Sequence, residues 1–157
     1  MDGERLVDRA VRVLARGGCD PIWVVLGAWV GDVPGARSVI NEDWPQGMGS
    51  SLAAGIRAIA DDQECADVDT IIVTLVDLPG LTDAAVARVG NAGSLAAATF
   101  GGVRGHPVAI GREHWAGVLR TAVGDRGARD YLRERSDITL VEVGDVADGS
   151  DLDLPSP

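Results

Sequence analysis

Apolar residues lie along this chain in short continuous runs and at helical spacings, separated by turns rich in Gly and Pro. The run over residues 71–77 is almost wholly apolar and β-branched, and it ends on the carboxylate of Asp77. A run without polar alternation is typical of a strand covered on both faces, as in a parallel sheet between helices. Pro79 and Gly80 then turn the chain towards a helix that begins at Thr82. We therefore expect residues 71–77 to form a central strand.

The rest of the pattern predicts helices and strands in alternation. Leu6, Ala10, Val13 and Leu14 share one face of a helix over residues 4–16, with arginines largely on the opposite face. Further strands are predicted over residues 22–26, 38–40, 95–100, 108–110 and 138–143, and further helices over residues 48–60, 82–89, 112–123 and 128–135. This alternation, without an internal repeat, predicts a single α/β domain over residues 1–157 with a mostly parallel sheet.

Composition narrows the class of protein. The 157 residues suit one domain, and no apolar run approaches the roughly 18 residues of a membrane helix. No basic, apolar leader opens the chain, and Cys19 and Cys65 are too few for a disulfide framework. These features favour a cytoplasmic protein with free thiols.

Charge excludes two classes of partner and one kind of catalyst. The net charge is −10 and the basic residues are dispersed, which argues against nucleic acid or a membrane as partner. All 14 basic residues are Arg, so the chain offers no lysine ammonium for catalysis.

Asp77 is the first candidate for chemistry. Ligands of open α/β sheets bind at the carboxyl ends of strands. A carboxylate there can hold Mg²⁺ against phosphate oxygens, because Mg²⁺ prefers one or two carboxylates together with water and substrate. The alternative is that Asp77 only caps the turn.

A second candidate group combines Asn41 with residues 44–55. Gly49, Ser50 and Ser51 stand at a predicted helix start and could offer N–H groups and hydroxyls to an anion or a nucleobase edge. A serine N-cap beside a loop glycine would explain the same residues without a ligand.

Three weaker groups follow along the chain. His106 lies among small residues in GGVRGHP, where it could contact a ligand or serve only the structure. GDRGAR, from Gly124 to Arg129, could hold a phosphate or form a solvated loop. Asp151 and Asp153 could add a second carboxylate for the metal, although acidic tails are usually only solvated.

The order of these groups is more specific than any one of them. In chain order they read N-x-x-W-x-x-G-M-x-S-S-L-x-x-G, V-D-x-P, G-x-x-G-H-P-V, G-D-R-G-A-R and D-x-D-x-P. Over nearly the whole chain this series resembles the MobA-like NTP transferase family, and most closely the branch of molybdenum cofactor cytidylyltransferase.

The resemblance implies a Rossmann-like three-layer fold and a nucleotidyltransferase. CMP from CTP, or GMP from GTP in the sister branch, would pass to the phosphate of molybdopterin with release of pyrophosphate. Metal and cationic groups would neutralise the triphosphate while the reacting phosphates are held in line. By resemblance, Asp77 would be the catalytic residue and would bind Mg²⁺ together with Asp153. The resemblance places five residues at the nucleotide: Gly27, Asn41, Gly49, Ser50 and Ser51. It places six residues on the pterin side: Gly105, His106, Pro107, Asp125, Gly127 and Arg129.

The sequence departs from the family at its front. Members begin with a strand and a glycine loop resembling L-A-A-G-x-x-x-R-M-G-x-x-K, whereas this chain opens at Met1 beyond that loop, with about 30 residues absent. The absent strand is normally central, so its neighbours at residues 22–26 and 71–77 would keep unpaired edges, which are costly when buried. Three alternatives follow: these strands close onto each other, the chain needs a partner, or the start codon is misassigned and the chain is truncated at its N-terminus. We favour the third, because the rest of the motif set is intact.

Two other functions remain open. The chain could be a non-catalytic module that binds molybdenum cofactor for a partner, such as a molybdoenzyme or its maturation chaperone. It could also be a nucleotidyltransferase of the same fold that acts on another phosphorylated acceptor.

Overall fold

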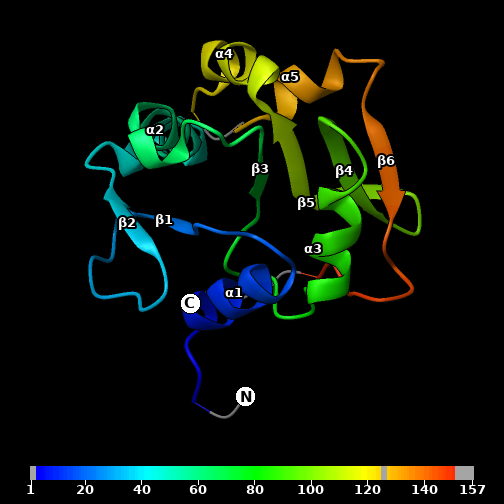
Figure 1. The fold of residues 1–157 in the computed structure, drawn as a ribbon, viewed down its shortest axis with the longest axis horizontal. Coiled ribbons are helices and arrows are strands. Elements are labelled where there is room, and N and C mark those ends of the chain that lie inside the picture. Colours follow the sequence, from blue (N-terminus) through cyan, green and yellow to red (C-terminus); the bar gives the residue numbers. More distant parts are fainter. Residues whose placement is uncertain (1–2, 125–126, 151–157) are drawn as a thin grey trace.

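The computed structural model describes residues 3–124 and 127–150, which form a mixed α/β fold (Figure 1). The elements in chain order are α1 (Leu6–Arg16), β1 (Trp23–Leu26), β2 (Arg37–Ile40), η1 (Trp44–Gln46), α2 (Met48–Asp61), η2 (Gln63–Cys65), β3 (Thr70–Val73), α3 (Asp83–Gly90), β4 (Leu95–Phe100), β5 (Val103–Gly111), α4 (Arg112–Thr121), α5 (Arg129–Arg133) and β6 (Thr139–Glu142). Each helix and strand expected from the apolar pattern is present, with ends shifted by a few residues. Within the described ranges, none of the helices has the length and apolarity needed to cross a membrane.

In the described part of the chain, the strands form two separate sheets. β1 and β2 pair in parallel, with Trp23 opposite Arg37. The larger sheet has the order β3-β5-β4-β6. In it, β4 and β6 are parallel, and β5 alone runs against its neighbours β3 and β4. Most strands therefore run in one direction, as the pattern predicted.

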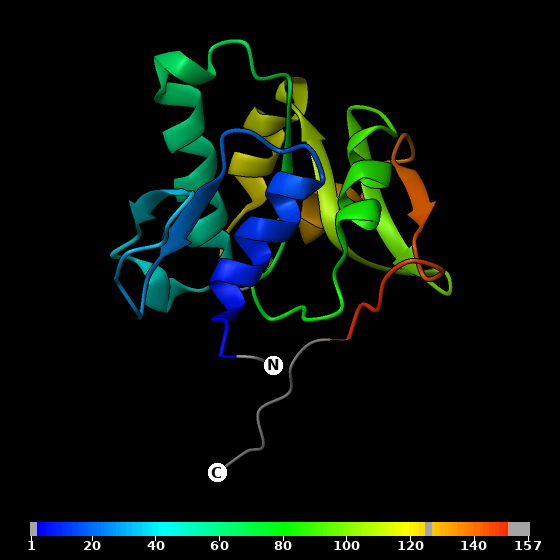
Figure 2. The same ribbon diagram turned by 60° about the horizontal axis from the view of Figure 1, so that its bottom comes forward.

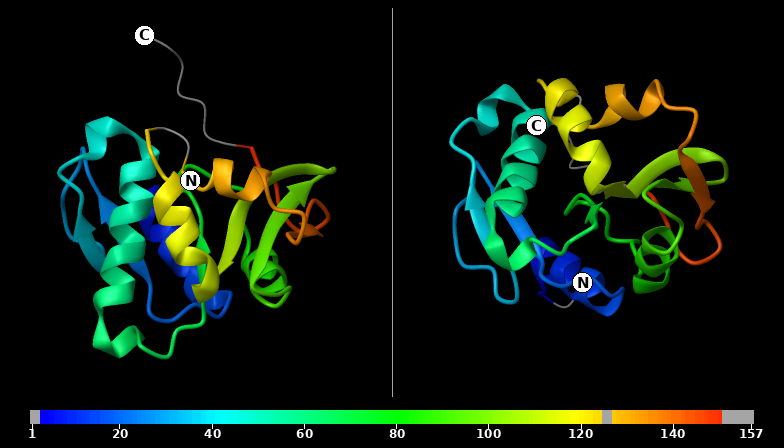
Figure 3. Two further views of the ribbon diagram at one scale, coloured as in Figure 1. Left: turned by 90° about the horizontal axis from the view of Figure 1, so that it is seen from above. Right: turned by 45° about the horizontal axis from the view of Figure 1, so that its top comes forward.

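Helices cover both faces of the larger sheet, which gives three layers (Figures 2 and 3). Alternate residues of the central strands point to opposite layers, because side chains alternate along a strand. Ala96, Ala98 and Ala109 face the cluster that contains α3, whereas Leu95, Ala97 and Ile110 face the cluster formed by α2, α4 and α5. α1 packs beside α3 on one side, and α2 packs beside α4 on the other.

The central strand is shorter than predicted. β3 ends at Val73, and Asp77 lies in the turn that follows rather than on the strand. Val73 pairs with Val108 of β5, so Pro107 is next on the opposite strand and has no N–H to continue the ladder. The prediction that the strand extends to residue 77 is thus wrong, because Pro107 ends the pairing after Val73.

The prediction that a strand begins at Val108 is also wrong, because β5 begins at Val103 and carries most of the GGVRGHP segment. Gly101 and Gly102 form the two-residue turn between β4 and β5, with φ of +61° and +85°. Such hairpin turns need positive φ at both positions, which glycine adopts without strain. His106 therefore stands on a strand of the sheet and not in a loop.

β1 and β3 do not pair with each other in the described part of the chain. Of the three alternatives for these strands, the one in which they close onto each other is therefore wrong. A cavity of about 1600 Å³ is lined by both of them.

Candidate active site

Asp77 is placed by the turn that leaves β3. Its Oδ1 atom is buried and has no hydrogen-bond partner among the described residues. Such an oxygen is costly unless a ligand satisfies it, since nearly all buried polar atoms are paired. The oxygen is therefore available to a ligand or to water.

The donor set around Asp77 suits a cation shared with substrate. Across residues 3–124 and 127–150, no group of three or more His, Cys, Asp or Glu could enclose a metal ion. Mg²⁺ needs no such group, because it commonly binds one carboxylate, several waters and substrate phosphates. Asp153, the expected second ligand, lies outside the described residues.

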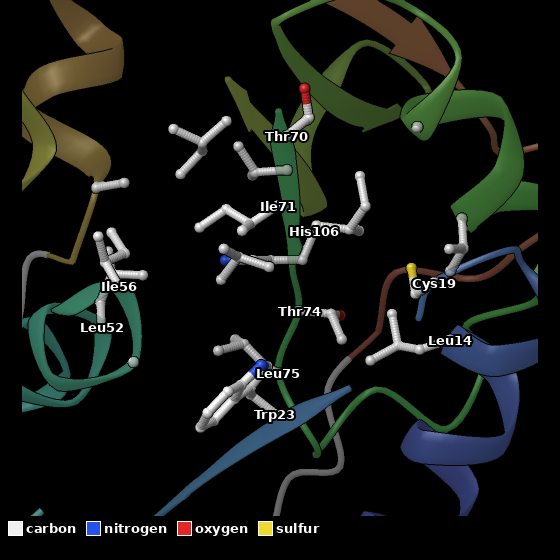
Figure 4. A pocket seen from close by; sticks show the side chains of 18 of the residues that line it. Leu14, Cys19, Trp23, Leu52, Ile56, Thr70, Ile71, Thr74, Leu75 and His106 are labelled. Atoms are coloured by element: carbon white, nitrogen blue, oxygen red, sulfur yellow. The ribbon is translucent and has the colours of Figure 1, made fainter. Parts of the chain in front are cut away.

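His106 connects Asp77 with the positive side of the site. It is half-buried on β5 and lines the cavity, beside Ile71 and Thr74 of the β3 segment (Figure 4). Burial lowers the pKa of His106; the negative charge of Asp77 opposes this shift, and the positive charge of Arg129 adds to it. A histidine with a lowered pKa is a neutral imidazole at neutral pH.

Asn41, Ser50 and Ser51 form a hydrogen-bonded cluster. The buried Asn41 donates from Nδ2 to Oγ of both serines, at 3.0 Å each, and its Oδ1 accepts the backbone N–H of Asp43. Ser51 also lines the cavity. The structure thus joins three residues expected at the nucleotide, and it places Ser51 at the cavity wall.

The serines do not cap their helix. The N-cap of α2 is Gly47, without a side-chain hydrogen bond, and Ser50 donates its hydroxyl to the carbonyls of Asp43 and Gly47. The alternative of a serine N-cap is therefore wrong.

Close packing requires glycine at two positions expected in the nucleotide site, Gly49 and Gly27. A Cβ on Gly49 would lie 2.8 Å from backbone atoms of Ala122 and Val123, and the Gly49 N–H already donates to Gly124. A Cβ on Gly27 would lie 2.5 Å from Cβ of Trp44. Close packing accounts for both glycines without a ligand.

The expected pterin-side residues are distributed around the cavity. Gly105, His106, Gly127 and Arg129 line it, and Pro107 is fully buried beside it. Gly127 needs its left-handed backbone, with φ of +52°, to lead the chain into α5. Asp125 lies outside the described residues.

Three further cavity residues were not singled out from the sequence. Arg104 and Arg133 line the same cavity as Arg129, and Thr74 carries a buried hydroxyl without a partner among the described residues. The signal for Arg104 was its place inside GGVRGHP. Arg133 gave no signal, because only the tertiary fold brings α5 to this cavity.

The fold defines a three-layer α/β protein, and Asp77 follows the carboxyl end of a strand, where ligands of open α/β sheets bind. The MobA-like NTP transferase domain matches residues 1–139, and the chain belongs to that family.

One curated relative and two solved structures are similar to this chain. Nicotine blue oxidoreductase of Paenarthrobacter nicotinovorans is 33% identical over 168 residues, covering 96% of this chain and 79% of that protein. The structure of Rv0371c from Mycobacterium tuberculosis H37Rv has a TM-score of 0.76 at 22% identity, covering 91% of this chain and 76% of that one. A nucleotidyl transferase from Methanothermobacter thermautotroptrophicus has a TM-score of 0.70 at 21% identity, covering 90% and 71%. The two structures support the nucleotidyltransferase fold alone.

Proposed function

We propose that this protein transfers CMP, or GMP, from a nucleoside triphosphate to the phosphate of molybdopterin. An oxygen of that phosphate attacks the α-phosphorus, the bond from the α-phosphorus to the β-phosphate breaks, and pyrophosphate leaves. The observation that carries the proposal is the buried Oδ1 of Asp77 at the turn after β3, which has no partner among the described residues and whose carboxylate opposes the lowering of the pKa of His106.

Asp77 would hold Mg²⁺, which supplies positive charge to the triphosphate during transfer. Rv0371c has also been crystallised with manganese, which supports a divalent cation at this fold. Asp77 is the one expected ligand that lies in the described part of the chain.

The remaining residues would bind and orient the two substrates. The Asn41–Ser50–Ser51 cluster holds Ser51 towards the nucleotide side. Arg104, Arg129 and Arg133 line the cavity and would neutralise phosphate oxygens, in a chain that has Arg as its only cationic residue besides His. Neutral His106 can accept a hydrogen bond from the molybdopterin substrate without adding a charge to the site.

The test is release of pyrophosphate from CTP and from GTP, with molybdopterin as acceptor and Mg²⁺ present. Asp77→Asn keeps the shape of the side chain and removes its charge. We expect the variant to lose about 100-fold or more of the rate, as with loss of an electrostatic transition-state contact. Glu64→Gln, an exposed carboxylate in η2, is the matched control. Full activity of Asp77→Asn would overturn the role of this residue.

The same assay separates the alternatives of acceptor and of catalysis. Release with a sugar phosphate or phospholactate, and not with molybdopterin, would identify another phosphorylated acceptor. Tight binding of the cofactor without any release would identify a binding module for a molybdoenzyme or its chaperone. A cytoplasmic location remains a prediction for all of these functions.

A second candidate function follows from the name of the 33% identical relative, an oxidoreductase of nicotine blue. Bleaching of nicotine blue by NADH or NADPH in the presence of this protein tests it directly. Two results together would favour the oxidoreductase. The Asp77→Asn variant would still bleach nicotine blue, and the unaltered chain would release no pyrophosphate.

A further inference from the structure

α5 carries two of the arginines that line the cavity, although the helix has only five residues. Arg129, Leu132 and Arg133 share one face of it, because residues three and four positions apart lie on the same side of a helix. All three line the cavity, and Leu132 is buried. So short a helix is not stable by itself. The position of both guanidinium groups therefore depends on what holds α5 against the rest of the fold.

Tyr131 holds α5 from the opposite side. It stands two positions from each arginine, and residues two apart do not share a helix face. α5 lies beside α4 (Figures 1 and 3), and the ring of Tyr131 packs on α4 at Gly117. A Cβ at position 117 would overlap this ring. The glycine thus leaves room on α4 for the Tyr131 ring.

A hydrogen bond fixes the ring in this position. The hydroxyl oxygen of Tyr131 lies 2.6 Å from Nδ1 of His114, and the two rings meet edge to face with centroids 5.8 Å apart. A hydroxyl both donates and accepts, so the bond forms with either tautomer of the imidazole. His114 is 7% exposed, and a buried polar group is costly without a partner. The guanidinium of Arg135 lies over the Tyr131 ring, 5.4 Å from its centroid.

We propose that Tyr131 and His114 are positioning residues, which set Arg129 and Arg133 for the phosphate groups of the substrates. Both stand behind α5 and not among the residues that line the cavity. They act through the helix, because the bond and the ring contact fix α5 and α5 fixes the two arginines. Side chains that are already held in place lose less conformational entropy on binding. The inference rests on the proposed function, since it takes phosphate groups as the ligand of these arginines.

Binding of inorganic pyrophosphate to the full chain, measured by titration calorimetry without Mg²⁺, tests this inference. Tyr131→Phe keeps the ring and removes only the hydroxyl, so we expect binding to weaken about three- to tenfold, the effect of one lost hydrogen bond. Thr121→Val is the matched control, because its hydroxyl bonds carbonyls within α4, and it should leave the affinity unchanged. Equal affinities for Tyr131→Phe and the unaltered chain would overturn the inference, as would a lack of pyrophosphate binding by the unaltered chain.

A double-mutant cycle separates positioning from a general effect on the fold. Arg133→Gln removes one of the two groups that Tyr131 positions and leaves Arg129 and Arg104 at the cavity. In this background, Tyr131→Phe should weaken pyrophosphate binding by a smaller factor than in the unaltered chain, because residues that act through one another are not additive. The same factor in both backgrounds would show that Tyr131 supports only the fold, and it would overturn the inference.

Two variants of His114 test the other side of the bond. The amide of Asn stands where Nδ1 of His stands, so His114→Asn can keep the bond to Tyr131, whereas His114→Leu cannot. We expect His114→Asn to bind pyrophosphate within about twofold of the unaltered chain, and His114→Leu to lose as much affinity as Tyr131→Phe. Equal losses for both variants would overturn the positioning role of His114.

The titration and the release assay can fail independently. A chain that binds pyrophosphate in dependence on Tyr131, but releases none from CTP or GTP, would overturn the proposed reaction and support the positioning role. A chain that transfers the nucleotide, while Tyr131→Phe binds pyrophosphate as the unaltered chain does, would support the reaction and overturn the positioning role.

Discussion

At the scale of single residues, burial decides which polar groups are available for chemistry. Asp77 keeps an oxygen without a partner in the described residues, whereas Asn41 uses its amide on Ser50 and Ser51. Gly49 likewise uses its N–H on Gly124. Among the residues expected from the sequence, Asp77 and Ser51 are therefore better placed for a ligand than Gly49.

The half-buried His106 should make the stability of the fold depend on pH. Burial lowers its folded pKa below the usual 6.5, so the unfolded chain takes up a proton first as the pH falls. Above pH 6.5, His106 has no such effect on the free energy of unfolding. As the pH falls from 6.5 towards the lower pKa of the folded state, His106 destabilises the fold. We expect His106→Asn to flatten this part of the curve of unfolding free energy against pH, measured with urea. An unchanged slope would contradict the shift.

Glu142 should make the stability of the fold depend on pH in a more acidic range than His106 does. Its carboxylate accepts the N–H groups of Gly101, Gly102 and Gly144 and the hydroxyl of Thr99, and these bonds lower its pKa to about 2. A lowered carboxyl pKa stabilises the fold above about pH 4.5 and loses that effect as the pH falls towards 2. We expect Glu142→Gln to lower the urea midpoint at pH 7, with the difference shrinking below pH 4.5. A constant difference across this range would refute the role of the charge.

At the scale of elements, close approaches fix how the helices meet the site. The first turn of α2 contacts the segment after α4 through Gly49, and β3 stops where Pro107 interrupts the ladder. α5 follows Gly127 and brings Arg129 and Arg133 to the cavity. The cavity wall thus depends on a few positions where a side chain or an N–H is missing.

Gly49→Ala should destabilise the fold by about 1–3 kcal/mol, as overpacking does, because its Cβ would lie 2.8 Å from backbone atoms. Gly90→Ala in α3 is the control, since its Cβ would meet Ile72 at an ordinary 3.6 Å and alanine favours a helix. Urea unfolding measures both variants. If Gly49→Ala is as stable as the unaltered chain and loses only nucleotide affinity, the glycine serves the ligand and not the packing.

At the scale of the whole molecule, the core is divided. Val11, Ile22, Leu26 and Val33 form a small cluster around β1, separate from the two clusters on the faces of the larger sheet. A sheet of two strands is marginal by itself, so the β1–β2 unit depends on the helices that pack against it.

Native-state hydrogen exchange should resolve this division. We expect the hydrogen-bonded amides of β1 and β2 to open at a lower free energy than those of β4 and β5, because fewer buried contacts hold them. β6, at the edge of the larger sheet, serves as the internal comparison for an edge strand. A single opening free energy for both sheets would show that they unfold as one unit.

Much of this protein could be predicted from its sequence because the signals were local. Continuous apolar runs and helical spacings were enough to place the strands and helices, and the motif order was enough to indicate the family. The start of β5 was missed because its proline and small residues disfavour a strand unless a neighbouring strand imposes it. The end of β3 was missed because it depends on Pro107 of the opposite strand, which is distant in the sequence.

Only the tertiary structure decided which groups share a cavity and which strands pair. Burial and the charge of Arg129 lower the pKa of His106 and the charge of Asp77 opposes them, although these two residues lie 23 and 29 positions away in the sequence. The split between β1 and β3 likewise depends on long-range pairing, which no local pattern encodes. The sequence by itself determined the elements, the family and the candidate residues, because these follow from local chemistry and motif order. Burial, register and the cavity depend on which distant segments meet, and that is a property of the folded chain alone.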